Sequence, residues 1–110
     1  MTLLPRAFHA WVTDNYGRGC KTNGLPWVIN CDFNLAFDMM SHFYKDLKNG
    51  TTYDPNWIFV FNQTDVYGLG KWGYVYVPKK CESKQCDVHF VLHGCEMSED
   101  IIGTIFIEQS

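Results

Sequence analysis

Apolar side chains recur along the chain with a helical period in two places. Between Phe33 and Lys48 they return every three or four positions and so share one face of a helix, with Ala36, Met39, Met40, Phe43 and Leu47. Asp32 is placed to cap this helix, and Asn49-Gly50 is a stop signal. A second helix is predicted from Glu99 onward, capped by Ser98, with the apolar positions Ile101, Ile102, Ile105 and Phe106.

Three segments between these helices have the composition of β-strands: Trp57 to Asn62, Gly73 to Pro78, and Asp87 to His93. The first two are placed to form a hairpin through the loop that ends at Lys71. The third is almost continuously apolar from Val88 to Leu92, which is typical of a strand buried on both faces.

The order helix, three strands, helix predicts an α/β fold with about three strands and flanking helices. Residues 1–30 contain turn signals without a sustained period and are expected to be an irregular N-terminal arm. Residues 31–110 are then the first part of an α/β domain. The sheet is expected to be incomplete, because a strand buried on both faces needs covering elements that this chain does not supply.

Composition and charge exclude several classes of protein. With 110 residues, of which 46% are hydrophobic and 19% charged, the chain is long enough for one globular core. The net charge is −3 and the nine basic residues are scattered, so no nucleic-acid partner is predicted. No apolar run approaches the roughly 20 residues that cross a bilayer, so no membrane association is predicted either.

Five cysteines are unusual for a reduced cytosolic protein of this length, yet Met1 to Trp11 lacks the features of a secretory signal. The short loop between Cys81 and Cys86 favours a disulfide, and Cys20 with Cys31 is a plausible second pair that leaves Cys95 over. A zinc site is the alternative, because thiolates and imidazoles are zinc ligands, although the spacing fits no standard site. Its ligands would come from Cys81, Cys86, His89, His93 and Cys95. No metal and no cofactor are predicted.

The third predicted strand ends in His93-Gly94-Cys95, and a loop and a helix follow. At this place α/β-hydrolases put one half of the oxyanion hole, because a backbone N–H at the end of a strand can point at the developing negative charge. Glycine permits the close approach of a substrate. His93 either orients this loop or simply ends the strand, while His89 is interpreted as an ordinary strand histidine.

Several blocks together resemble the extracellular poly(3-hydroxybutyrate) depolymerases and related esterases. They are Gly73 to Pro78, the closely spaced cysteines, Val88 to Cys95, and Ile102 to Ser110, with a looser match upstream from Gly24. The resemblance covers about residues 24 to 110 and implies a secreted serine esterase of the α/β-hydrolase fold, acting on a polyester or small ester. In that family the backbone N–H corresponding to Cys95 helps to form the oxyanion hole.

The resemblance also implies that the nucleophile, the acid and the base lie further along, beyond Ser110. No serine of the chain lies in a Gly-x-Ser-x-Gly elbow: Ser41, Ser83, Ser98 and Ser110. The histidines His9, His42, His89 and His93 therefore have no serine to activate. We expect the N-terminal portion of a depolymerase, inactive alone, whose open sheet edges permit self-association. The alternative is a secreted, disulfide-stapled binding module without catalysis.

Two further patterns carry weaker signals. Asn49 and Asn62 each begin an N-glycosylation sequon, but such triplets arise by chance about once in a chain of this size and support secretion only weakly. The tryptophans are expected in the core more than on a polymer-binding surface: Trp11, Trp27, Trp57 and Trp72.

Overall fold

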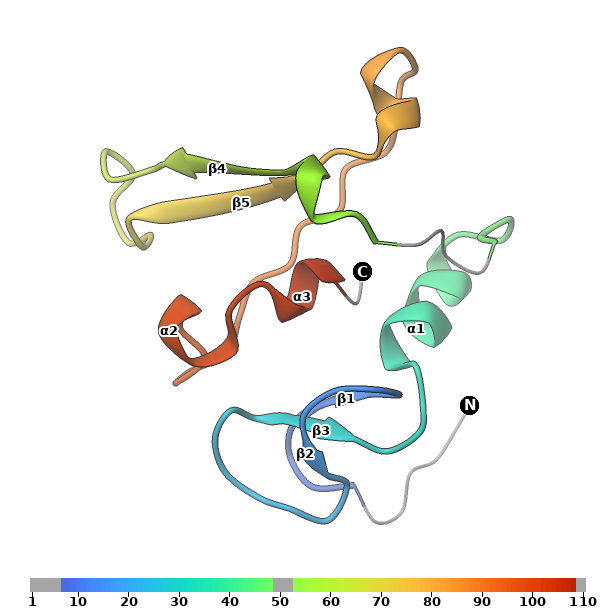
Figure 1. The fold of residues 1–110 in the computed structure, drawn as a ribbon, viewed down its shortest axis with the longest axis vertical. Coiled ribbons are helices and arrows are strands. Elements are labelled where there is room, and N and C mark those ends of the chain that lie inside the picture. Colours follow the sequence, from blue (N-terminus) through green and yellow to red (C-terminus); the bar gives the residue numbers. More distant parts are fainter. Residues whose placement is uncertain (1–6, 49–52, 109–110) are drawn as a thin grey trace. The chain divides into compact units, whose positions relative to one another are not determined.

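The computed structural model describes residues 7–48 and 53–108 (Figure 1). Of these, residues 7–48 and 92–108 belong to one compact unit, and residues 53–91 form a second. The second unit is thus inserted in the sequence between the two segments of the first. The predicted division between an arm and a domain at residue 30 does not coincide with these units.

Residues 11–30 contain secondary structure where an irregular arm was expected. Three short strands, β1 (Trp11–Thr13), β2 (Arg18–Gly19) and β3 (Val28–Asn30), form a parallel sheet in the order β1-β3-β2. Trp11 pairs with Val28, and Arg18 pairs with Ile29. The prediction was wrong because strands of two or three residues are too short to show a period of two. Only their tertiary setting, in which Val28 and Ile29 are fully buried, identifies them.

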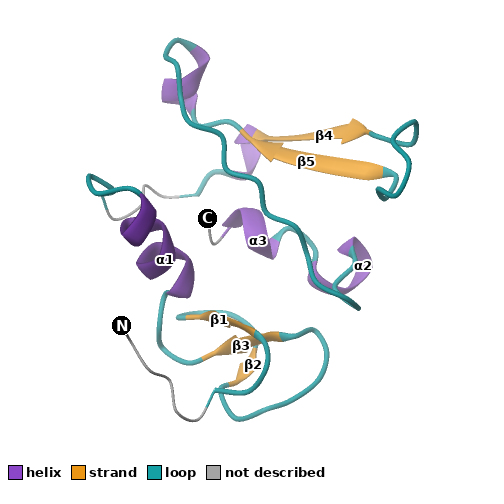
Figure 2. Cartoon of the chain, turned by 180° about the vertical axis from the view of Figure 1, so that it is seen from behind, coloured by secondary structure: helices purple, strands orange, loops and turns teal. Residues whose placement is uncertain are grey.

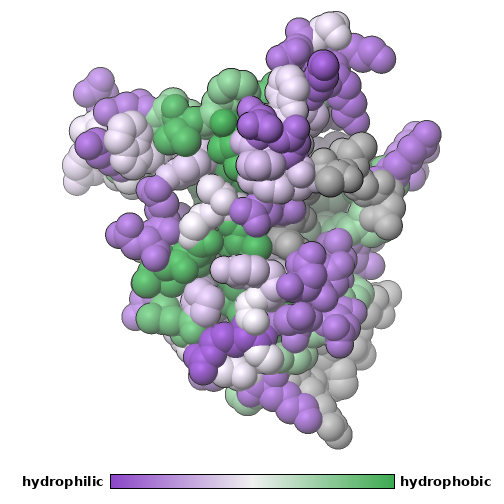
Figure 3. All heavy atoms as spheres, in the orientation of Figure 1, coloured by the Kyte–Doolittle hydropathy of each residue, from purple (hydrophilic) through white to green (hydrophobic). Residues whose placement is uncertain are grey.

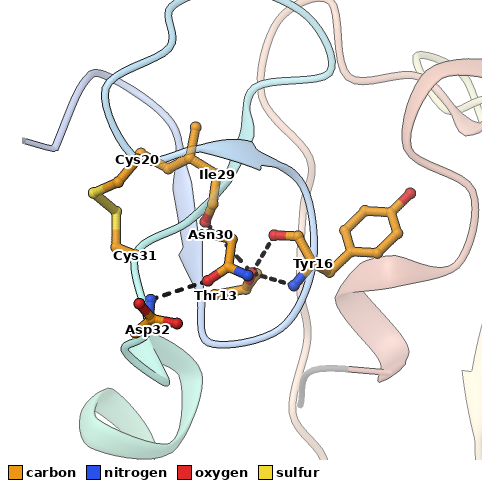
Figure 4. The surroundings of a disulfide bond; sticks show 7 residues. All are labelled: Thr13, Tyr16, Cys20, Ile29, Asn30, Cys31 and Asp32. Atoms are coloured by element: carbon orange, nitrogen blue, oxygen red, sulfur yellow. Dashed lines mark hydrogen bonds between the residues drawn. A yellow bond between two sulfur atoms is a disulfide. The ribbon is translucent and has the colours of Figure 1, made fainter.

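A buried threonine and a disulfide fasten this small sheet (Figure 4). The Thr13 hydroxyl accepts a hydrogen bond from the Tyr16 N–H at 3.0 Å and donates to the Tyr16 carbonyl oxygen, which closes the turn after β1. The Cys31 N–H donates to the Thr13 carbonyl oxygen at 2.9 Å, and Cys31 forms a disulfide with Cys20. The bond therefore joins the residue after β2 to the residue after β3.

Removing this bond with the double variant Cys20→Ala/Cys31→Ala is expected to lower the free energy of unfolding by about 3 kcal/mol, since the disulfide closes a loop with a sequence separation of 11. Urea unfolding followed by tryptophan fluorescence measures the change. The matched variant Cys81→Ala/Cys86→Ala opens a loop with a separation of only 5 and is expected to cost less, about 2 kcal/mol. Unfolding midpoints that equal the midpoint of the unaltered chain would contradict this expectation.

Helix α1 (Leu35–Phe43) confirms the first predicted helix but is shorter at both ends. Its N-cap is Asn34, whose side-chain oxygen accepts from the Phe37 N–H at 2.8 Å. Asp32 is not the cap, because its backbone has a positive φ of 53° two residues before the cap. The helix ends at Tyr44, which is extended.

The second predicted helix is divided in two. Helix α2 (Glu99–Ile102) ends at Gly103, whose φ is +56°, and α3 (Ile105–Glu108) begins two residues later. Ser98 occupies the N-cap position of α2, but its side chain makes no capping hydrogen bond. Ile102 and Ile105 of these helices pack in the core of the first unit, a cluster that also contains Val28 and Met97, with Trp11, Trp27 and Phe106 against it. Ile101 of the predicted apolar face is 40% exposed.

The second unit contains the predicted hairpin. Strands β4 (Ile58–Asn62) and β5 (Trp72–Tyr76) pair antiparallel, with Ile58 opposite Tyr76 and Asn62 opposite Trp72. The 3-10 turns η1 (Pro55–Trp57) and η2 (Lys79–Glu82) flank the hairpin in the chain.

The segment from Asp87 to His93 is not a strand (Figure 2). Its apolar side chains are exposed, with exposed fractions of 71% for Val88, 84% for Phe90 and 84% for Leu92. The prediction of a strand buried on both faces was wrong because no other strand among the described residues pairs with this segment. Apolar side chains are also exposed on the β4–β5 hairpin, where Phe59, Val60 and Phe61 are about half exposed (Figure 3).

Among the described residues, no helix combines the length and the apolar content that crossing a bilayer requires.

Candidate functional site

The candidate oxyanion loop forms a tight turn between the exposed apolar segment and α2. The Met97 N–H donates to the Gly94 carbonyl oxygen at 3.2 Å, which closes a turn whose central residues are Cys95 and Glu96. The exposed His93 ring places Nδ1 2.9 Å from the same carbonyl oxygen. In a turn of this kind the first and last residues supply the hydrogen bond, and the backbone N–H groups of the central residues stay available to other acceptors.

The backbone N–H of Cys95 has no acceptor in the part of the chain that the structure describes. Glu96 follows with a φ of +61°, a conformation that costs a residue with a side chain about 1 to 2 kcal/mol. Backbone conformations of this kind cluster at ligand-binding and active sites, where the surrounding structure maintains them. The turn therefore presents, on a constrained backbone, a donor that no described group of the protein accepts from.

Met97 fixes one end of the turn. Its side chain is 8% exposed and belongs to the core cluster with Val28, Ile102 and Ile105. A Cβ atom added at Gly94 would lie 3.3 Å from the Met97 sulfur, so the glycine lies directly against this anchor. The N–H of Cys95 is thus only two residues from a core side chain, while Cys95 itself is exposed.

The cysteines pair as the sequence predicted. Cys20 is bonded to Cys31 and Cys81 to Cys86, and Cys95 is a free thiol. The alternative zinc site loses two of its five ligands, because sulfurs bonded to each other are not thiolates. No cluster of three or more candidate metal ligands occurs within residues 7–48 and 53–108.

The serines and histidines do not form a catalytic pair. The Ser41 hydroxyl is buried on α1 without a hydrogen-bond partner, Ser83 follows η2, and Ser98 precedes α2, while Ser110 lies outside the described residues. His42 contacts the Phe43 ring at a centroid distance of 6.1 Å. His89 lies in the exposed segment, so its interpretation as a strand histidine was wrong. Across the described residues no hydrogen bond joins a serine hydroxyl to an imidazole.

The tryptophans divide between the core and the surface. Trp11 and Trp27 pack against the core of the first unit, as predicted, and the Trp11 ring lies 5.3 Å from the Phe106 ring, edge to face. Trp72 is 42% exposed, and the Lys71 ammonium lies 4.8 Å from its ring centre. The prediction of a core position is therefore wrong for Trp72.

No family model matches the sequence. A poly(3-hydroxybutyrate) depolymerase of Delftia acidovorans is 38% identical over 100 residues, which are 84% of this chain and 20% of that protein. A polyhydroxybutyrate depolymerase of Talaromyces funiculosus is 32% identical over 114 residues, covering 94% of this chain and 33% of that protein.

Two solved structures have the same fold over 94% of this chain, which corresponds to 36% of each of those chains. The poly(3-hydroxybutyrate) depolymerase of Penicillium funiculosum superposes with a TM-score of 0.78 at 28% identity. A depolymerase variant with one serine replaced by alanine, in complex with a trimer of R3HB, superposes with a TM-score of 0.78 at 30% identity. The predicted mixed α/β fold class is confirmed by this likeness.

The chain spans about a fifth to a third of the length of the curated relatives that it matches. The sequence comparisons cover 84% and 94% of this chain, and the structural comparisons cover 94% of it. This chain is therefore homologous to a part of the poly(3-hydroxybutyrate) depolymerases.

Proposed function

We propose that this chain carries the oxyanion loop of a carboxylic ester hydrolase, with the Cys95 backbone N–H as a donor and His93 and Gly94 as residues of the loop. The observation that carries the proposal is the turn from Gly94 to Met97. It leaves the Cys95 N–H without an acceptor among the described residues, on a backbone that Met97 anchors in a core. Homology to a part of the depolymerases supports the same assignment.

The chemistry follows from where charge develops during ester cleavage. Attack on the carbonyl carbon moves negative charge onto the carbonyl oxygen, and a fixed N–H donor about 2.7 to 3.1 Å away stabilises it. In α/β-hydrolases a second donor is the N–H of the residue after the nucleophile. No Gly-x-Ser-x-Gly elbow occurs in the 110 residues. The nucleophile, together with its acid and its base, is therefore proposed to belong to other parts of the whole protein.

The proposed substrate is a polyester of 3-hydroxybutyrate or a small ester. One structural neighbour is a depolymerase complexed with a trimer of R3HB, and both curated relatives are named for this polymer. The proposed location is extracellular, because the two disulfides are of the kind that persists in oxidising surroundings.

The isolated chain is expected to hydrolyse p-nitrophenyl butyrate no faster than the background, because an oxyanion donor without a nucleophile supplies no covalent step. A burst of p-nitrophenol that a serine-directed phosphonate abolishes would contradict the proposal. Sedimentation of the same sample tests self-association, which the exposed apolar side chains of the hairpin and of the segment from Val88 to Leu92 support.

The whole protein provides the decisive experiment. Sequencing the transcript in both directions from these 110 residues is expected to reveal a Gly-x-Ser-x-Gly-like elbow. The full-length product should then clear a suspension of poly(3-hydroxybutyrate) and lose this activity when the elbow serine is replaced by alanine. A full-length protein without an elbow, together with cooperative unfolding of the isolated chain, would support the binding module instead.

A further inference from the structure

We infer that Asn62 is an acceptor site for N-linked glycosylation, with a lipid-linked oligosaccharide pyrophosphate as the donor of the sugar. The site lies at the end of β4 in the second unit and is separate in sequence from the oxyanion loop. The inference does not depend on the proposed function.

The side chain of Asn62 is held in a turn by the third residue of its own sequon. Its Oδ1 atom accepts a hydrogen bond from the Thr64 backbone N–H at 2.9 Å and another from the Thr64 hydroxyl at 2.5 Å. Asn62 and Thr64 are both exposed. The sequence pattern alone has a high rate of chance occurrence, but here the hydroxyl that defines it contacts the amide that would be modified.

This arrangement suits the chemistry of the acceptor. An amide nitrogen is a poor nucleophile because its lone pair is delocalised toward the carbonyl oxygen. When the nitrogen gives up a proton, negative charge moves onto Oδ1, where the two Thr64 donors stabilise it. Both hydrogen bonds use Oδ1, so they fix the carboxamide without involving its nitrogen.

In the transfer itself, one bond to the sugar forms and one bond to it breaks. A bond forms between Asn62 Nδ2 and C1 of the first sugar, while the bond from C1 to the pyrophosphate oxygen breaks. The lipid pyrophosphate leaves with that electron pair, and a base of the transferase takes the proton from Nδ2. No redox step is involved.

The surroundings of Asn62 leave space for a glycan. Every residue from Thr64 to Lys71 is exposed, so a sugar on Asn62 meets solvent along the hairpin loop. The base of the loop is fixed, since the Gln63 N–H donates to the Lys71 carbonyl oxygen at 2.9 Å and Gln63 Nε2 donates to the Trp72 carbonyl oxygen at 3.1 Å. The two disulfides are compatible with an oxidising compartment of the kind in which secreted proteins are glycosylated.

The test is secretion of the full chain from a eukaryotic cell with the change Asn49→Gln, which removes the other sequon. A flexible C-terminal tag carries a sequon of its own. Lectin capture through the glycan on this tag selects the molecules that were exposed to the transferase. Peptide-N-glycosidase treatment in heavy-oxygen water then marks each occupied asparagine, and mass spectrometry reads the peptide that contains Asn62. We expect Asn62 to be occupied in most captured molecules.

Matched variants separate the hydroxyl from the rest of the turn. Thr64→Val keeps the size of the side chain and removes the hydroxyl, so occupancy of Asn62 should be lost, whereas Thr64→Ser should retain it. Asn62→Gln should also abolish the label. An unmodified Asn62 peptide in captured, unsubstituted molecules, or occupancy that Thr64→Val leaves unchanged, would overturn the inference.

Discussion

Replacing Cys95 by proline in the full-length protein is expected to lower kcat about 100- to 1000-fold and to leave KM nearly unchanged, which is the effect of removing one oxyanion donor. Proline lacks the backbone N–H that the turn from Gly94 to Met97 leaves available. The proposed donor would contact an oxygen that carries negative charge only during the reaction, so the loss should fall on kcat. Initial rates on a soluble 3-hydroxybutyrate oligomer measure both constants.

The control variant is Cys95→Ala, which removes the thiol and keeps the N–H. It should retain most of the activity, because Cys95 forms no disulfide within the described chain and its proposed role lies in the backbone. Thermal unfolding of both variants shows whether the turn survives the proline. Full activity of a folded Cys95→Pro protein, or equal losses in the two variants, would show that the N–H is not the donor.

Replacing Gly17 by alanine is expected to lower the free energy of unfolding of the first unit by about 3 kcal/mol, at the upper end for single substitutions. The added Cβ would lie 2.4 Å from the Val28 carbonyl oxygen and 2.6 Å from its carbon, both of which are backbone atoms that cannot move aside alone. Gly17 also has a φ of +98°, which alanine adopts only with strain. The central strand of the parallel sheet would therefore be displaced. Urea unfolding followed by tryptophan fluorescence measures the loss.

Gly24→Ala is the matched control in the same unit. Gly24 has a similar φ of +104°, but a Cβ there would meet only the Arg18 side chain at an ordinary contact distance of 3.5 Å. Its expected cost of about 1 to 2 kcal/mol reports the backbone conformation alone. Equal losses for Gly17→Ala and Gly24→Ala would show that the close approach to Val28 has no energetic weight.

Elements whose partners are near in sequence were predictable, and elements whose partners are distant were not. The hairpin of β4 and β5 and the helix α1 depend on neighbouring residues, and both were predicted. The predicted apolar face of α1 is only partly covered, because Ala36 is buried whereas Phe43 is 67% exposed. The strands between Trp11 and Asn30 were missed because burial of Val28 against Met97 and Ile105, not local pattern, makes this segment a sheet. The opposite error occurred at Val88 to Leu92, where a strand-like composition has no strand to pair with among the described residues.

The sequence motif of the candidate site could be predicted, but the backbone conformation of its turn could not. His93-Gly94-Cys95 after an apolar run marked the candidate loop, and the resemblance of the surrounding blocks indicated its proposed backbone donor. Nothing in the sequence marked Glu96 as the residue with a positive φ, because glutamate has no preference for that conformation. The side-chain oxygen of Asn34, not that of Asp32, caps α1 for a similar reason: both residues are good caps, and backbone conformation decides between them.

The insertion of residues 53–91 between the two segments of the first unit has a consequence for folding during synthesis. Val28 is made long before Met97, Ile102 and Ile105, so the core that joins them cannot close until the hairpin and the exposed segment have left the ribosome. Closing so long a loop carries an entropic cost and slows folding. The hairpin, whose contacts are local, is therefore expected to form first, and the turn at Cys95 acquires its anchor last.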